Sequence, residues 1–426
     1  MTTKILIVGS GGREDAIAQT LKSTNSNVEL VCAPGNGGMM EIAKCFPVKA
    51  DDSAGLLALA KEIKPNLTVV GPEAPLVAGI TDLFYASRFM VVGPRKAAAQ
   101  LEGSKWFAKQ FMKRHHIPTA DAWHFTHPND AASFILAHEN QPLVIKADGL
   151  CGGKGVTVAE NGKEALAAMR DLMVAKKFGS AGNTVVIEKK LTGWECSLIV
   201  LSDGVNVVPF LPATDYKRRN DRNQGVNTGG MGCYSPVPAF TPALKDEVMK
   251  KIVTPTVNWI GDEGMPFRGF LYFGLMITDQ GPYVLEYNVR MGDPEASVIL
   301  PLLKSNFSQL LLASAVPSGL RGVKADWRGE DVAVGVVAVA ESYPDKSSSD
   351  EVITGIRQAR ELGALVYHAG TARNMASEVV TAGGRILDVV GIGKNFRDAR
   401  ELAYTGMERI NFKGKDCRTD IASQLS

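Results

Sequence analysis

The chain has 426 residues, 45% of them hydrophobic and 22% charged, which is ordinary for a folded protein of several domains. A formal net charge of +2 gives no basis for binding nucleic acid or an acidic membrane surface, while local basic clusters can still bind phosphates. The six cysteines form no C-x-x-C pair, and no run reaches the roughly 20 apolar residues that span a bilayer. Without a signal-peptide pattern after Met1, these features predict a cytoplasmic protein with reduced thiols.

The N-terminal region alternates strand and helix patterns. Apolar strand patterns occupy residues 4–8, 28–32, 67–70 and 89–92, and each runs into a loop rich in glycine or proline. This β-α-β order favours an open parallel sheet. Such sheets bind ligands in the loops at the carboxyl ends of their strands.

The rest of the chain divides into two further regions. The middle region has predicted helices at 103–115, 162–175 and 297–315, and predicted strands at 143–145, 156–159, 184–187, 197–201, 270–277 and 283–287. From about residue 330, the predicted strands are 332–339, 364–369 and 385–392, and a predicted helix covers 395–404. We therefore expect an α/β protein with an N-terminal open parallel sheet and a small C-terminal α/β domain.

The loop after the first strand, Gly9-Ser10-Gly11-Gly12-Arg13-Glu14, does not fit a dinucleotide fingerprint. Glu14 stands where Gly or Ala is required, and the second strand ends in Cys32-Ala33-Pro34 without an acid for a ribose. Backbone N–H groups at the start of a helix still favour an anion such as a phosphate, and Arg13 adds a cation. A purely structural tight turn is the alternative.

The strand at 284–290 places Glu286, Asn288 and Arg290 at a period of two, so the three side chains share one face. Carboxylate and amide oxygens suit Mg²⁺, and a fixed guanidinium suits a developing phosphoryl charge. Gly292-Asp293-Pro294 then reads as a turn. The alternative interpretation is a solvated strand face that ends in a loop.

Two lysines near residue 150 favour a polyphosphate. Lys146 ends a predicted strand, and Lys154 lies in a flexible loop with Gly152, Gly153 and Gly155. Such a loop can fold over phosphates with its backbone N–H groups and its ammonium. It is not a Walker A loop, because G-x-x-x-x-G-K-[ST] is absent. An ordinary glycine-rich hairpin remains the alternative.

Two further segments are weaker candidates. The apolar strand 185–187 leads to Glu188 and Glu195, which can serve an adenine edge and a ribose, although a solvated strand end is the simpler interpretation. The glycine-dense loop 227–232 follows Asp215 and Lys217, which suggests substrate contact. A disordered surface loop is the alternative there.

These motifs, in this order, resemble the ATP-grasp superfamily and, more narrowly, the phosphoribosylamine–glycine ligase family over essentially the whole chain. The motifs that carry the resemblance are residues 11–14, 33–36, 71–76, 97–105, 144–149, 227–232, 292–295, 368–371 and 383–385.

The resemblance implies an ATP-dependent carboxylate–amine ligase. Glycine would be phosphorylated by ATP on its carboxylate and then attacked by 5-phosphoribosylamine, as a step of purine biosynthesis. The domains would be an N-terminal one at 1–102, an ATP-grasp region at 103–325 with a nucleotide lid at about 122–192, and a C-terminal domain at 326–426. We expect a monomer or weak homo-oligomer.

The same resemblance assigns roles to residues. ATP would be held by Lys105, Lys146, Gly152, Gly153, Lys154, Gly155, Glu188, Leu191 and Glu195. Mg²⁺, with Mn²⁺ as a substitute, would be bound by Glu286 and Asn288. The catalytic residues would be Arg290 and Asp215. The substrates would be bound by Gly11, Gly12, Arg13, Glu14, Asn36, Glu73, Asn227, Thr228, Gly229 and Gly230.

Two positions depart from the family pattern. Asp15 and Tyr216 each stand where the family usually has histidine. They motivate the alternative of a divergent ATP-grasp ligase that joins a different amino acid or amine. A non-catalytic nucleotide-binding protein is the third hypothesis, and the retained Lys105, Lys146 and Glu286 argue against it.

Overall fold

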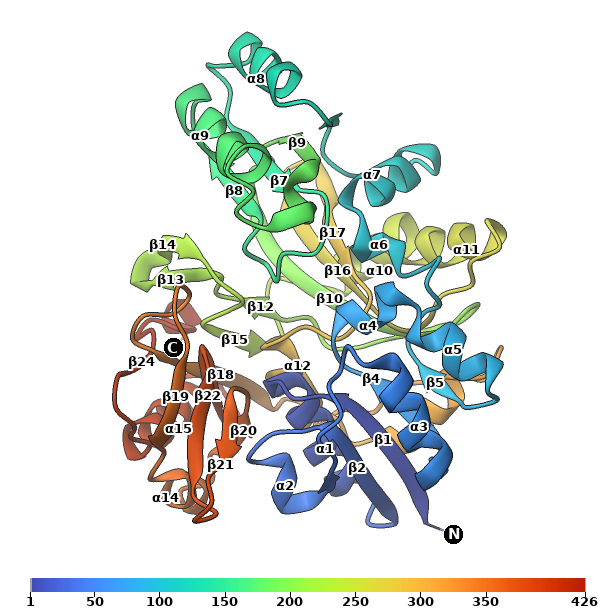
Figure 1. Ribbon diagram of the computed structural model, residues 1–426, viewed down its shortest axis with the longest axis vertical. Helices are drawn as coiled ribbons and strands as arrows, with labels where there is room; N and C mark the ends of the chain where they lie inside the picture. The colour runs from blue at the N-terminus through green and yellow to red at the C-terminus, as the bar shows by residue number, and fades with distance from the viewer. Residues whose placement is uncertain (1, 426) are drawn as a thin grey trace.

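The computed structural model describes residues 2–425. Figure 1 shows three lobes that meet at a central junction: a lid at the top, the N-terminal lobe at the lower right and the C-terminal lobe at the lower left. The central part of the chain connects all three. None of the helices in residues 2–425 combines the length and apolar character that crossing a membrane requires.

The N-terminal lobe is built on a parallel sheet, as the sequence predicts. Its elements are β1 (Thr3–Gly9), α1 (Gly12–Thr24), β2 (Val28–Pro34), α2 (Met39–Ile42), β3 (Lys44–Cys45), α3 (Ser53–Ile63), β4 (Leu67–Val70), α4 (Glu73–Ala78), α5 (Ile80–Ala86) and β5 (Val91–Val92). The strand order is β3-β2-β1-β4-β5, and every pair is parallel. The edge strand β3 escapes prediction because two residues are too short to show a periodic pattern.

The lid is an antiparallel sheet with a separate apolar core. It contains β6 (Ala122–Phe125), α8 (Pro128–Ala137), β7 (Leu143–Ala147), β8 (Val156–Ala159), α9 (Gly162–Met173), a short 3-10 turn (Gly179–Asn183) and β9 (Val185–Lys189), in sheet order β6-β9-β7-β8. Ile135, Ile145 and Met169 belong to its core, which contains lid residues only. A unit with its own core can move without disrupting the others.

The central region pairs a four-stranded antiparallel sheet with helices. Its elements are α6 (Gln100–Gly103), α7 (Lys105–Arg114), β10 (Trp194–Asp203), β11 (Val207–Pro209), α10 (Pro242–Val248), a π-helical turn (Met249–Val253), α11 (Thr254–Asp262), β16 (Arg268–Thr278), β17 (Gly281–Asn288), α12 (Glu295–Ile299), a 3-10 turn (Leu300–Leu302) and α13 (Phe307–Ser314). The sheet order is β11-β10-β16-β17. Helix α1 of the N-terminal lobe packs against α12 and α13, so the N-terminal lobe and the central region share one set of core side chains.

The C-terminal lobe is an α/β unit around β18, in which all nine residues are buried. Its elements are β12 (Thr214–Asp215), β13 (Arg218–Asn220), a 3-10 turn (Asp221–Asn223), β14 (Gln224–Asn227), β15 (Gly232–Ser235), β18 (Val332–Ala340), β19 (Ser348–Val352), α14 (Ile356–Glu361), β20 (Leu365–His368), β21 (Thr371–Arg373), β22 (Val379–Gly383), β23 (Arg385–Gly393), α15 (Phe396–Arg409), β24 (Lys415–Asp416) and a last 3-10 turn (Ser423–Leu425). The main sheet runs β12-β15-β18-β23-β20, with β24 paired to β18. Strands β12 and β15 come from the glycine-dense middle segment, so that segment and the C-terminal lobe form one sheet.

Arg418 anchors the end of the chain to this shared sheet. Its side chain is 1% exposed and donates to both carboxylate oxygens of Asp420, each at 2.8 Å. The same guanidinium donates to the Arg218 carbonyl at 3.0 Å and lies 4.8 Å from the Tyr216 ring. A buried guanidinium with this set of partners stabilises the fold only while the partners are in place.

We predict that Arg418→Met lowers the free energy of unfolding by about 3 kcal/mol, because it removes the cation that pairs with Asp420 and the donor to the Arg218 carbonyl. Urea denaturation followed by circular dichroism measures the change. Arg397→Met, an exposed arginine on α15, is the matched control and should change stability by less than about 0.5 kcal/mol. Equal stability of the two variants would refute the anchoring role of Arg418.

Candidate active site

Lys105 is placed by the start of α7. Ser104 caps that helix by accepting from the Phe107 N–H, and Asp148, which follows β7, accepts from the Trp106 N–H at 2.7 Å. The Lys105 ammonium then lies 3.1 Å from Oε2 of Glu286 on β17. The start of α7 therefore joins the lid to the strand that carries the predicted metal ligands.

The expected alternation is present, although β17 ends at Asn288 and Arg290 lies just beyond the strand. Glu286, Asn288 and Arg290 are partly exposed, and they alternate with buried Tyr287 and Val289. A bulge interrupts the pairing of β16 with β17 next to Glu286, and the Leu285 carbonyl accepts from Lys146 at 3.1 Å. Bulges commonly redirect groups toward a functional site.

The charge state of Glu286 follows from its neighbours. Burial alone would raise the pKa of this carboxyl, but Lys105, Lys217 and Lys146 outweigh burial and lower it to about 2. Glu286 is therefore a carboxylate at neutral pH, the form that binds a divalent cation.

Glu188 lies between two lysines at the base of the lid. Its two carboxylate oxygens lie 2.7 Å from the Lys146 ammonium and 2.9 Å from the Lys109 ammonium. All three side chains are almost completely buried. The predicted phosphate lysine, Lys146, is thus held by a charge pair and by the Leu285 carbonyl. Leu191 follows β9 on the chain segment that leads from the lid to β10.

The glycine loop of the lid rests on the C-terminal lobe. Gly152 and Gly153 take positive φ angles of 55° and 76°, which glycine adopts without strain, and Gly155 follows two residues later. Lys154 donates to the Pro344 carbonyl at 3.1 Å and lies 5.8 Å from the Tyr343 ring. The structure therefore does not bring Lys154 together with Lys105 and Lys146.

The loop 227–230 lies beneath that glycine loop. Asn227 donates from its side chain to the Val156 carbonyl at 3.2 Å, and the Gly229 N–H donates to the Tyr343 hydroxyl at 2.9 Å. Thr228 donates to the Lys217 carbonyl and accepts from the Gly230 N–H. This loop is ordered by contacts with both the lid and the C-terminal lobe, unlike the disordered surface loop of the alternative interpretation.

Asp215 and Glu195 share the cation Lys217. The Lys217 ammonium lies 2.9 Å from Glu195 and 3.8 Å from Asp215. Burial, together with the nearby Glu295 and Glu195, raises the pKa of Asp215 to about 7 against the attraction of Lys217. Lys217 is the main cause that lowers the pKa of Glu195. Asp215 is thus a carboxyl whose charge changes near neutral pH.

Arg290 connects three parts of the chain. Its guanidinium donates to Glu73 at 3.2 Å, to Glu102 at 2.9 Å and to Oδ1 of Asn288 at 3.1 Å. The second oxygen of Glu102 accepts from the Val289 N–H at 2.7 Å. Burial tends to raise the pKa of Glu73, but Arg290 and Arg13 lower it to about 2. Arg290 is therefore fixed in place before any substrate binds.

The first glycine loop is shaped by buried polar side chains. Glu14 accepts from the Gly11 N–H at 2.6 Å and from Arg13 at 2.7 Å. Asn36 donates to the carbonyls of Ser10 and His368, at 3.0 and 2.6 Å. Both Glu14 and Asn36 are 2% exposed, so in this structure they support the loop. A Cβ added at Gly12 would lie 2.9 Å from Oδ2 of Asp388, which explains the need for glycine there.

The two departures from the family pattern also have structural explanations. Asp15 accepts from the His368 N–H at 2.6 Å and from the Gln19 amide at 2.9 Å, and it is fully buried. The Tyr216 hydroxyl donates to Gln424 and accepts from the Ala422 N–H, both at 2.9 Å. Both side chains contact the C-terminal lobe, and these hydrogen bonds join neither of them to the lysines and carboxylates of the site.

Sequence reasoning missed several residues that the structure places in this junction. Glu102 lies in the motif 97–105, in which only Lys105 has a predicted role. Arg385 pairs with Asp293 at 3.0 Å and donates to the Gly229 carbonyl at 2.6 Å. Lys109 and Glu295 also belong to the junction, and Glu295 accepts from Ser197 at 2.9 Å. Glu102, Arg385 and Glu295 lie inside recognised motifs and Lys109 lies shortly after one, and this position is the signal that could have indicated them.

The donor set of Glu286 and Asn288 fits Mg²⁺, which commonly takes one or two protein oxygens and completes its shell with substrate phosphates and water. Within residues 2–425, no group of three or more His, Cys, Asp and Glu side chains is arranged to hold a metal ion. A metal at this face would therefore depend on the nucleotide for its remaining ligands.

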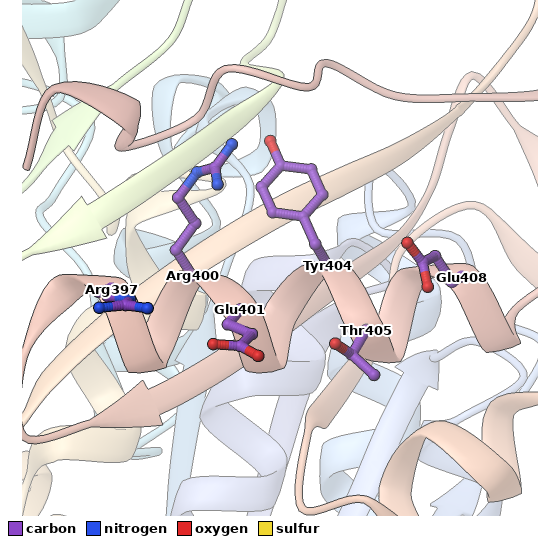
Figure 2. A pocket seen from close by; sticks show the side chains of 6 residues that line it. All are labelled: Arg397, Arg400, Glu401, Tyr404, Thr405 and Glu408. Carbon is purple, nitrogen blue, oxygen red and sulfur yellow. The ribbon is translucent and has the colours of Figure 1, made fainter. Parts of the chain in front are cut away.

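Two surface hollows lie away from this junction. Figure 2 shows one of about 460 Å³, whose lining side chains all come from the single helix α15. Its lining residues are Arg397, Arg400, Glu401, Tyr404, Thr405 and Glu408. A second hollow, of about 620 Å³, lies between α5 and the segment 264–268. Neither contains any of the lysines or carboxylates described above.

The fold and the site define an ATP-grasp protein, in which Lys146 of an antiparallel lid and Lys105 of α7 face the strand that carries Glu286 and Asn288. Three models of phosphoribosylglycinamide synthetase match this chain: the N domain at residues 3–102, the ATP-grasp (A) domain at 103–296 and the C domain at 333–424. The chain is 46% identical to a phosphoribosylamine–glycine ligase of Xanthomonas axonopodis pv. citri, over 98% of this chain and 97% of that protein. It is 45% identical to one from a Nostoc species, over 99% and 100% of the two chains.

Solved structures agree. A phosphoribosylamine–glycine ligase from Thermotoga maritima superposes with a TM-score of 0.85 at 34% identity, covering 99% of this chain and 100% of that one. The biotin carboxylase domain of Hydrogenobacter thermophilus 2-oxoglutarate carboxylase shares the fold, with a TM-score of 0.71 at 16% identity over 98% and 92% of the two chains. This chain belongs to the phosphoribosylamine–glycine ligase family.

We predict that Glu286→Gln lowers kcat by at least about 100-fold, because it removes the carboxylate that would bind the metal and pair with Lys105. Steady-state ADP release at saturating ATP measures the effect, and circular dichroism checks the fold. Asp279→Asn, an exposed acid on the turn between β16 and β17, is the control and should keep full activity. Full turnover by the Glu286 variant would refute the metal assignment.

Proposed function

We propose that this chain joins glycine to 5-phosphoribosylamine with ATP, through glycyl phosphate, and releases glycinamide ribonucleotide, ADP and phosphate. Membership of the family over the full length of the chain supports this reaction. The structural observation that carries it is the convergence of Lys105, Glu286 and Arg290 from the central region on one junction with the acids of the N-terminal lobe.

In this proposal the first step is phosphoryl transfer to the glycine carboxylate. Lys105 and Lys146 neutralise the nucleotide phosphates, and the Lys154 loop folds over them after leaving Pro344. Glu188 and Leu191 border the adenine and Glu195 borders the ribose. Arg290 lies beside the transferring group, where its fixed guanidinium stabilises the charge of the transition state without reorganisation.

Mg²⁺, when bound, would neutralise part of the negative charge of the nucleotide phosphates. Glu286 and Asn288 are the residues proposed to hold it, with Mn²⁺ as a substitute.

Glycine is proposed to bind between Asp215 and the loop 227–230. A carboxylate at Asp215 matches the ammonium of glycine, and the backbone of Gly229 and Gly230 allows close approach of so small a substrate. Asp215 acts in binding and orientation, because attack on the acyl phosphate needs no protein nucleophile.

The phosphoribosyl group is proposed to lie against the loop 11–14, with Arg13 and the start of α1 as phosphate donors. Glu73 is proposed to accept from ribose hydroxyls, while Glu14 and Asn36 hold the loop in shape. We further propose that the enzyme works in the cytoplasm as a monomer or weak homo-oligomer and binds no nucleic acid or membrane.

One assay tests the proposed reaction. Purified enzyme is incubated with ATP, Mg²⁺, glycine and freshly generated phosphoribosylamine, and ADP release is followed together with mass detection of the amide product. Omitting either glycine or the amine should abolish ADP release. If this pair gives no ADP while another amino acid or amine does, the chain is a divergent ligase, and the proposal is wrong.

A pH dependence follows from Asp215. Since its pKa is raised to about 7, the carboxyl is neutral below that pH and charged above it. The KM for glycine should therefore rise as the pH falls from about 8 to about 6, because the ammonium loses its counter-charge. Asp215→Asn should give a high KM at every pH. A glycine KM that is the same in the wild type at pH 6 and 8 would contradict the assignment.

A further inference from the structure

Lys109 is a buried cation that none of the roles above uses. It lies on α7, one helical turn after Lys105, and its side chain is 4% exposed. An ammonium is rarely buried so deeply without a specific partner, because it loses its hydration. Burial lowers the pKa of Lys109 to about 8 despite the attraction of Glu188.

All three donors of this ammonium have acceptors. They are Oε2 of Glu188 at 2.9 Å, Oγ1 of Thr119 at 2.7 Å and the Ala120 carbonyl at 3.4 Å. Thr119 in turn donates to the Val284 carbonyl on β17 at 2.7 Å. Lys109 therefore contacts the lid strand β9 directly and reaches β17 through Thr119.

Thr119 and Ala120 belong to the segment that leads from α7 into β6, the first strand of the lid. This segment also pairs with β17, because the Val284 N–H donates to the Pro118 carbonyl at 2.8 Å. Lys109 therefore connects the start of the lid to Glu188, on the proposed adenine side of the nucleotide site, and through Thr119 to β17, on the proposed metal side.

The charges explain why a second lysine is needed. Glu188 and Lys146 alone would form a neutral pair, and the carboxylate would compete with ATP for the Lys146 ammonium. Because Lys109 binds the other oxygen of Glu188, the carboxylate is shared between two lysines. The buried group of Lys109, Lys146 and Glu188 therefore keeps one net positive charge. That charge lies where the proposed phosphates would bind, and a low-dielectric surrounding strengthens its effect.

We infer that Lys109 is a positioning residue for the nucleotide: it holds Glu188, leaves Lys146 free to bind phosphate, and fixes the entry to the lid. The inference rests on the proposed use of ATP. It predicts that loss of the Lys109 charge weakens nucleotide binding and leaves glycine binding at Asp215 unaffected.

The test compares Lys109→Met with Lys113→Met, an exposed lysine on the same helix. We expect Lys109→Met to raise the KM for ATP and the calorimetric Kd for ADP at least about tenfold, with the KM for glycine within about twofold of wild type. Lys113→Met should match the wild type in all three. Unchanged nucleotide affinity in Lys109→Met would overturn the inference, as would equal losses for ATP and glycine.

A pH series separates this role from simple support of the fold. Lys109 faces Glu188 on β9, Lys146 on β7 and Lys105 on its own helix, and these are the charged groups that act on it. Wild-type affinity for ADP should fall as the pH rises through about 8, because the neutral amine no longer balances Glu188. Lys109→Met should lack this step and Lys109→Arg should shift it to higher pH. A step that persists in Lys109→Met would refute the role.

Folding and function are tested separately. If Lys109→Met does not fold, Lys109→Arg, which keeps the positive charge, is the variant to test. Its step in ADP affinity should lie at a higher pH than that of the wild type, and a step at the same pH in both proteins would refute the inference. Calorimetry with ADP needs no turnover, so it tests the role of Lys109 independently of the proposed reaction. If the wild type binds ADP with the expected pH dependence but releases no ADP in the ligase assay, the proposed reaction is wrong and the role of Lys109 still holds.

Discussion

The Arg290 guanidinium is the interaction on which the arrangement of this site depends. It joins Glu73 of the N-terminal lobe, Glu102 of α6 and Asn288 of β17, and each contact comes from a separate part of the chain. A largely buried guanidinium stabilises the fold only while its carboxylate partners remain in contact with it. Loss of a partner would leave an uncompensated charge away from water and raise the free energy of the folded state. The N-terminal lobe is therefore held against the end of the strand that carries the proposed metal ligands.

The same balance of burial and neighbouring charge sorts the carboxyls of the junction into two kinds. Glu286 is surrounded by lysines and its pKa falls to about 2, whereas Glu102 shares Arg290 with Glu73 and its pKa rises to about 7. Burial acts in the same direction on both, so the number of nearby cations decides the difference. One group is permanently charged for binding a cation, and the other can hold a proton.

Much of this organisation could be predicted from the sequence, because it is recorded in local patterns. The parallel sheet follows from repeated β-α-β order, and the face of β17 follows from the period of Glu286, Asn288 and Arg290. The family follows from motifs that are each short but occur in a fixed order. Where a function depends on neighbours along the chain, periodicity and motif are sufficient.

The rest could not be predicted, because it depends on contacts between distant residues. Glu102 meets Val289 across 187 positions of sequence, and Asp15 meets His368 across 353. Nothing near Asp15 indicates that its side chain turns toward another lobe, so the sequence suggested a changed substrate site where the structure has a contact between lobes. Lys109 is similar: its periodic position on a helix does not reveal that it is buried against a carboxylate.

The shared sheet of the C-terminal lobe determines where the chain can be divided into fragments. β15 from the middle of the chain pairs with β18, and β12 pairs with β15, so two strands of this sheet lie about 100 residues before the rest. A fragment cut at the apparent boundary near residue 326 would expose the edge of β18, which is apolar along its length and open to pairing with other chains. Chimeras that exchange the C-terminal part between relatives should therefore carry residues 214–235 with it, because the functional module is discontinuous in the gene.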